Sequence, residues 1–174
     1  MALTFPANWG QGAREGLVVE FQRSNESVWV GNFAPGLGGI DEVLAHPNGA
    51  DVLVVSSGDL WRVNPRTQDA IWLASAVFGS WVISGPPRLV FSDQDVAFLC
   101  VGAEALLWAT PRISWDGFRG IQVDHEVLRG EAWSPVDDNW SFFRVKLADG
   151  SVVGGSYTGP EMTWDLEDLK RKLV

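Results

Sequence analysis

Side chains that commonly catalyse reactions or bind metals are scarce in this chain. Its 174 residues include one cysteine, Cys100, and two histidines. A single cysteine cannot form an internal disulfide, and its apolar setting in AFLCVG is typical of a buried side chain in a reducing compartment. Two histidines and one cysteine do not supply an ordinary structural zinc site. We therefore expect no metal and no cofactor.

Positive charge is also in short supply. The chain has 13 basic and 22 acidic residues, which gives a formal net charge of −9. An acidic protein repels phosphate backbones, so we expect no direct nucleic-acid ligand. The same field attracts a basic protein and speeds its encounter. The charge therefore favours a basic protein partner.

Long apolar runs and catalytic motifs are missing as well. The longest uncharged stretch, residues 70–87, is interrupted by serine, glycine and paired prolines, and it suits strands better than a membrane span. No basic residue precedes an apolar segment at the N-terminus, so we expect a soluble cytoplasmic protein without membrane contact. There is no G-x-S-x-G nucleophile motif and no phosphate-binding loop motif. These absences favour a non-enzymatic protein.

Aromatic residues are abundant, with ten tryptophans and nine phenylalanines. Such side chains suit pleated sheets, and the short apolar runs alternate with turn residues at the spacing of an all-β domain. We predict a single all-β domain over residues 1–174, with an irregular lead-in over 1–15. The predicted strands form a hairpin at 16–33 and three antiparallel, four-stranded meanders at 40–74, 80–112 and 119–156.

Two of the meanders share a sequence pattern. Asp51 and Gly58 recur 44 residues later as Asp95 and Gly102, and the Leu-Trp pair ending at Trp61 recurs 47 residues later. A period near 45 with four short strands resembles the blades of β-propellers, without the motifs of a particular propeller family. The resemblance implies a small or incomplete propeller-like fold. A β-sandwich or an open barrel is the alternative.

The C-terminus has a different pattern. In residues 163–174, acidic side chains come first and basic side chains last, which complements a helix dipole, and Thr163 is a suitable N-cap. Leu166, Leu169 and Leu173 fall on one helical face. We therefore predict a short C-terminal helix that covers an open sheet edge or end, with docking of a partner as the alternative.

Candidate binding residues lie where the repeats differ from one another. Tryptophans beside loops rich in Gly, Pro, Asp and Asn are typical of a surface that binds protein or carbohydrate. Asp137-Asp138-Asn139 lacks the alternating ligands of a calcium loop, so we interpret its carboxylates as surface charges. The predicted binding residues are Trp115, Asp116, Trp133, Asp137, Asp138 and Trp140.

Three hypotheses for function follow from these features. The first is a non-enzymatic binding protein with an acidic surface, for example an immunity-type protein that neutralises a basic toxin or another basic partner. The second is a carbohydrate-binding domain or glycan-active enzyme that combines loop tryptophans with carboxylates such as Asp116 or Glu131. The third is a self-associating structural subunit, for example a homodimer that completes its sheets with a second copy.

Overall fold

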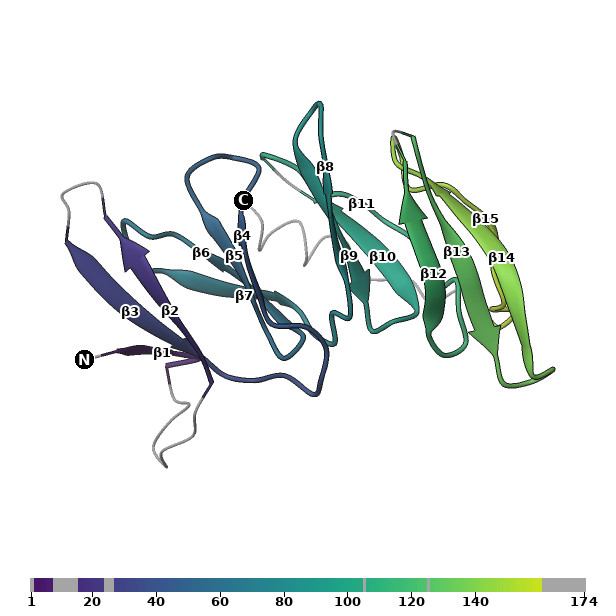
Figure 1. The fold of residues 1–174 in the computed structure, drawn as a ribbon, viewed down its shortest axis with the longest axis horizontal. Coiled ribbons are helices and arrows are strands. Elements are labelled where there is room, and N and C mark those ends of the chain that lie inside the picture. The colour runs from purple at the N-terminus through teal and green to yellow at the C-terminus, as the bar shows by residue number, and fades with distance from the viewer. Residues whose placement is uncertain (1, 8–15, 24–26, 105, 125, 161–174) are drawn as a thin grey trace. The chain divides into compact units, whose positions relative to one another are not determined.

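The chain folds into strands joined by short turns (Figure 1). The computed structural model describes residues 2–7, 16–23, 27–104, 106–124 and 126–160, which contain 15 strands and no helix. The all-β prediction is confirmed for these residues. The helix predicted for 163–174 lies outside them. Within the described part of the chain, no helix has the length and apolar character needed to span a bilayer.

The strands form four sheets in two compact units, residues 1–77 and 78–174. Each unit contains two of the sheets, and the described strands of each sheet form an open row that does not close on itself. The prediction that the whole chain is one domain stays a prediction.

The first sheet of unit 1 has the strand order β1-β3-β2. Its strands are β1 (Leu3–Phe5), β2 (Leu17–Gln22) and β3 (Val28–Phe33). The predicted hairpin is formed by the antiparallel strands β2 and β3, and β1 pairs with β3 in parallel. The expectation of an irregular lead-in is therefore wrong for residues 3–5. The apolar Leu3 and Phe5 flank Thr4 in a short alternating run that suits an edge strand.

The second sheet of unit 1 is an antiparallel meander in chain order. It contains β4 (Glu42–Ala45), β5 (Val52–Ser56), β6 (Asp59–Val63) and β7 (Ala70–Ala74). The β5–β6 turn consists of Ser57 and Gly58, which both have positive φ angles, 43° and 87°. Two positive φ angles in a two-residue connection match the twist of a hairpin. A Cβ at Gly58 would also collide with the Gly38 carbonyl oxygen, so this position requires glycine.

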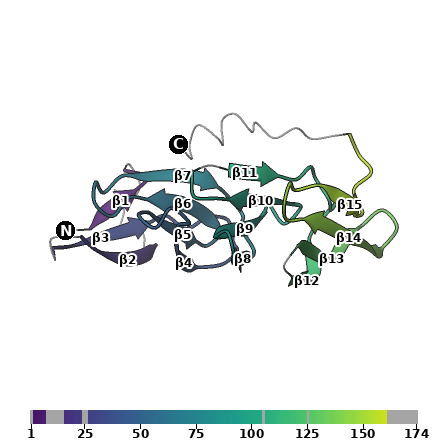
Figure 2. The same cartoon turned by 90° about the horizontal axis from the view of Figure 1, so that it is seen from above.

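Unit 2 contains two further antiparallel meanders, whose strands also follow one another in chain order (Figure 1, Figure 2). The first contains β8 (Ser80–Ile83), β9 (Arg88–Asp93), β10 (Ala97–Val101) and β11 (Leu106–Ala109). The second contains β12 (Phe118–Val123), β13 (Val127–Ser134), β14 (Asn139–Lys146) and β15 (Val152–Gly154). Two of the four-stranded sheets, at 42–74 and 80–109, fall within predicted meander ranges, and the third, at 118–154, begins one residue before its predicted range of 119–156.

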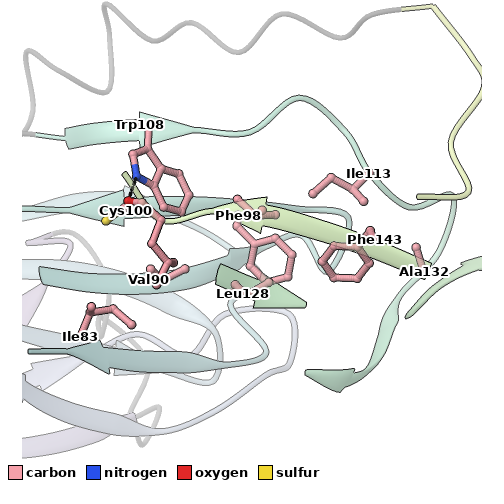
Figure 3. Packing of buried hydrophobic residues seen from close by; sticks show 11 residues of the cluster. Ile83, Val90, Phe98, Cys100, Trp108, Ile113, Leu128, Ala132 and Phe143 are labelled. Atoms are coloured by element: carbon pink, nitrogen blue, oxygen red, sulfur yellow. Dashed lines mark hydrogen bonds between the residues drawn. The ribbon is translucent and has the colours of Figure 1, made fainter. Parts of the chain in front are cut away.

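An apolar cluster joins the two sheets of unit 2 (Figure 3). Phe98 of β10 is fully buried, and its ring centroid lies 4.6 Å from that of Phe118 and 5.7 Å from that of Phe143. Phe118 and Phe143 belong to the neighbouring sheet, so these aromatic contacts connect the two sheets of unit 2. A comparable cluster around Phe33, Val54 and Trp61 joins the two sheets of unit 1.

A tryptophan hydrogen bond also links the two sheets within each unit. The Trp29 indole N–H donates to the Pro65 carbonyl oxygen at 2.9 Å, and the Trp108 indole N–H donates to the Leu147 carbonyl oxygen at 2.9 Å. Both acceptors follow the third strand of the neighbouring four-stranded sheet. A buried indole usually requires a partner for its polar N–H group, and here the next sheet supplies that partner.

Candidate functional site

Trp133 and Trp140 form a pair on one face of the last sheet. They lie directly opposite each other on β13 and β14, with ring centroids 5.1 Å apart and an interplanar angle of 47°. The Arg119 guanidinium lies 4.3 Å from the Trp140 ring centroid and also donates to Glu131 at 2.8 Å. Both tryptophans are half-buried strand residues. Because Arg119 covers the Trp140 ring, that ring offers a poor stacking surface for a sugar.

Trp115 has different neighbours. Its ring makes an edge contact with Tyr157 at 4.6 Å, and the Arg112 guanidinium lies 5.7 Å from its centroid. Among the described residues, no ring contact joins Trp115 to Trp133 or Trp140. The link to Trp133 is made by the backbone, because the Trp115 amide donates to the Trp133 carbonyl at 3.2 Å.

Two buried serines fix the turn that carries Asp116. The Ser114 hydroxyl donates to the Gly117 carbonyl at 2.6 Å and accepts the Asp116 amide at 3.2 Å. The Ser156 hydroxyl donates to the Trp133 carbonyl at 2.6 Å. Sequence reasoning missed both serines, because their role depends on contacts between distant segments. They hold Asp116 beside the end of β13.

The three predicted aspartates are exposed and lie on two turns that flank the end of β13. Asp116 follows Trp115 in the serine-held turn, and Asp137 and Asp138 lie at the tip of the β13–β14 hairpin. No ion pair between described residues includes any of them. We call Asp116, Asp137 and Asp138 the acidic end of unit 2.

Two further aspartates lie near the β9–β10 turn of the same unit: Asp93 is the last residue of β9, and Asp95 lies in the turn itself. Burial raises the pKa of Asp93 to about 6. Burial is also the largest cause that raises the pKa of Asp95 to about 6, with a smaller contribution from the charge of Asp116 and an opposing hydrogen bond from the Phe118 backbone. The charge of the acidic end is therefore felt at Asp95.

The remaining reactive side chains are arranged for packing. Cys100 is fully buried, and burial raises the pKa of its thiol to about 12, so it is a poor nucleophile. His46 is buried in unit 1, and burial lowers its pKa. In the parts of the chain that the structure describes, no group of three or more His, Cys, Asp or Glu side chains is placed to hold a metal ion.

A second feature, a pair of arginines, was not predicted. Arg129 on β13 and Arg144 on β14 are exposed and lie directly opposite each other. The alternating patterns of VLRGEAWS and NWSFFRVK place charged and aromatic residues on one face of each strand. This alternation is the feature of the sequence that could have indicated that both arginines are exposed. The pairing of the two arginines depends on the register, which the sequence pattern does not fix.

No protein-family model, curated protein sequence or solved structure matches this chain.

Proposed function

We propose that the protein is a non-enzymatic binding protein that captures a basic protein partner at the acidic end of unit 2. The observation that carries the proposal is the placement of three exposed carboxylates, those of Asp116, Asp137 and Asp138, on two adjacent turns, with no ion pair to any described residue. Charge complementarity between two protein surfaces supplies specificity and a faster encounter.

The surrounding structure supports a preformed binding surface. Backbone hydrogen bonds connect Trp133 to both Trp115 and Gly117, so the Asp116 turn is fixed to the base of the hairpin that carries Asp137 and Asp138. A rigid surface loses little conformational entropy on binding. The chain's net charge of −9 adds long-range attraction for a basic partner.

An immunity-type role is the form of this proposal that fits best. An inhibitor of a basic toxin needs a stable acidic surface and no catalytic group of its own, and it acts in the cytoplasm where the toxin would do harm. We therefore include neutralisation of a basic toxin and a cytoplasmic location in the proposal.

The test is affinity capture from a lysate of the source cells, with identification of the retained proteins by mass spectrometry. The variant carries Asp116→Asn, Asp137→Asn and Asp138→Asn, and asparagine is well tolerated at the positive φ of Asp138, 52°. The control is Asp69→Asn, which neutralises an exposed aspartate in unit 1. We expect wild type and control to retain a basic protein at low salt and the triple variant to lose it. Equal retention by all three proteins would refute the proposal.

The other two functional hypotheses stay open to simple tests. Carbohydrate binding would change tryptophan fluorescence on titration with a glycan panel, and light scattering would reveal a homodimer. The Arg119 contact with Trp140 makes carbohydrate the weaker candidate.

We also propose that the meanders are related to one another as propeller blades. The support is that all three four-stranded sheets follow the chain order, as blades do. Small-angle X-ray scattering would distinguish a ring-like arrangement from an extended row or a sandwich.

A further inference from the structure

The outer face of the β12–β15 sheet has an unusual charge for an acidic protein. Its cations are Arg119, Arg129, Arg144 and Lys146, and its anion is Glu131, so four positive charges and one negative charge give a net +3. Glu131 pairs with Arg119 at 2.8 Å, and Lys146 pairs with Asp149 of the following turn at 3.5 Å. These pairs leave Arg129 and Arg144 without a carboxylate partner among the described residues.

The two remaining arginines occupy the least favourable relative position for like charges. Directly opposed residues on antiparallel strands have Cβ atoms about 4.5–5.5 Å apart, and like charges placed there destabilise a sheet. One arginine and one carboxylate at these two positions would have a lower interaction energy than two arginines. The arrangement therefore costs stability in the isolated protein, and an anion bound between the guanidinium groups would remove that cost.

A β-bulge orients one of these arginines. Between the pairs Arg119–Glu131 and Gln122–Arg129, two residues of β12 face the single residue Gly130. The bulge brings Gln122 to the outer face, where its side-chain oxygen accepts a hydrogen bond from Arg129 Nε at 3.2 Å. That bond uses one of the five guanidinium N–H groups and leaves the four on the two terminal nitrogens available for a ligand.

The surface around the arginines is hollowed. One shallow cavity of about 330 Å³ is lined by Gln122, Arg129, Gly130 and Arg144, together with Gly120, Glu131 and Phe142. A second, of about 250 Å³, continues from Phe142 and Arg144 toward β15. The two hollows share Phe142 and Arg144, so they adjoin each other at β14, and together we call them the groove.

Exposed apolar side chains flank the same groove. Phe142 is 69% exposed and Val153, which lies opposite Arg144 on β15, is 75% exposed. A free inorganic anion would leave both side chains in water. A ligand that fills the groove must combine negative charge with apolar groups at close spacing.

We propose that this groove binds an extended, acidic peptide segment of a protein partner, with a carboxylate held between Arg129 and Arg144 and an apolar side chain on Phe142 and Val153. An extended peptide places alternate side chains on one face, which suits a groove with charged and apolar positions side by side. Arginine binds a carboxylate through two parallel hydrogen bonds. The site is separate from the acidic end. It would bind an acidic ligand, whereas the acidic end would bind a basic one.

The proposal is tested with the capped peptide Ac-Glu-Ser-Leu-Ser-Glu-NH2, whose two Glu side chains and one Leu side chain share one face when it is extended. It is titrated into the full chain and followed by NMR chemical-shift changes. Matched peptides carry Gln or Lys in place of every Glu, and inorganic phosphate is a fourth ligand. We expect only the Glu peptide to bind, with shifts centred on residues 129, 130, 142, 144 and 153. Binding of phosphate without the peptide would overturn the assignment to a peptide, as would equal binding of the Gln peptide.

Variants separate a binding role from a structural one. Arg144→Gln should weaken peptide binding at least about tenfold, and Arg144→Lys, which keeps the charge and loses the fork, should weaken it by less. Arg66→Gln is the control, because it removes an exposed positive charge in unit 1. We expect the urea midpoint of Arg144→Gln to equal or exceed that of the wild type.

A lower urea midpoint for Arg144→Gln, together with unchanged peptide affinity, would show that the arginine pair is structural and would overturn the proposal. Equal weakening by Arg66→Gln would also overturn it, because the effect would then reflect net charge alone. A dimer that dissociates only in Arg144→Gln would assign the groove to a second copy in place of a peptide. None of these results depends on the acidic end, so the two proposals can fail separately.

Discussion

Replacing Asp93 with asparagine is expected to stabilise the protein at neutral pH. Asp93 is 7% exposed, and its pKa is raised from 3.8 to about 6 by burial. At pH 7.5 the folded protein must therefore hold a charged carboxylate in a poorly solvated position. A shift of about 2 pKa units corresponds to about 3 kcal/mol, and we take this value as an upper limit for the gain in free energy of unfolding.

The pH dependence gives this prediction its sign. Between pH 3.8 and about 6, the folded state binds more protons at Asp93 than the unfolded state does. The contribution of Asp93 to stability is therefore greatest below pH 3.8 and is lost as the pH rises through about 6. Because an asparagine side chain cannot ionise, the advantage of Asp93→Asn should be largest at pH 7.5 and should shrink toward zero near pH 4.

The assay is urea denaturation followed by tryptophan fluorescence, at pH 7.5 and pH 4. Asp137→Asn is the control, because this exposed aspartate lies in the same unit and loses little solvation on folding. It should change stability by less than about 0.5 kcal/mol at both pH values. The reasoning would be refuted if Asp93→Asn destabilised the protein at pH 7.5, or if its effect were the same at both pH values.

Three further predictions concern packing in unit 2. Trp108→Phe removes the indole donor to the Leu147 carbonyl and should lower the free energy of unfolding by about 1–2 kcal/mol, measured by urea denaturation. Gly150→Ala should destabilise more than Gly85→Ala in the same assay; both glycines have positive φ, but a Cβ at Gly150 would lie 2.8 Å from the Trp108 ring whereas one at Gly85 meets no atom within 4 Å. Equal losses would argue against the ring contact. Cys100 should resist a thiol reagent in native protein at pH 8 and react after unfolding, because it is fully buried with a pKa of about 12.

The sequence was informative about strands because strand formation depends on local patterns. Alternating apolar residues and turn residues predicted three four-stranded meanders, and the ends of the observed sheets differ from the predicted ranges by at most three residues. The internal repeat was less informative, because Trp61 lies on the third strand of its sheet whereas Trp108 lies on the fourth. The repeat is thus displaced by one strand relative to the sheet boundaries.

The repeated aspartates likewise differ in their roles. The Asp51 carboxylate pairs with Arg62 at 2.6 Å, whereas Asp95 has a positive φ of 53° and accepts a hydrogen bond from the Phe118 backbone. The two aspartates of the repeat therefore make different contacts. Similar residues at similar spacing can follow from the common needs of tight turns without equivalent tertiary contacts.

The candidate site shows the same division between local and distant information. Asp137 and Asp138 could be assigned to a turn because a Pro- and Asp-rich segment favours one. The pairing of Trp133 with Trp140 and of Arg129 with Arg144 required the strand register. A shift of one residue would move all of these side chains to the opposite face, and composition does not determine that shift.

The indole links described above also provide each unit with its own internal probe. The Trp29 proton is protected only while the two sheets of unit 1 remain together, and the Trp108 proton reports in the same way on unit 2. Their resonances in a proton NMR spectrum lie apart from the backbone amides. Hydrogen exchange at these two positions would therefore reveal, in the intact chain and without a label, whether one unit opens before the other.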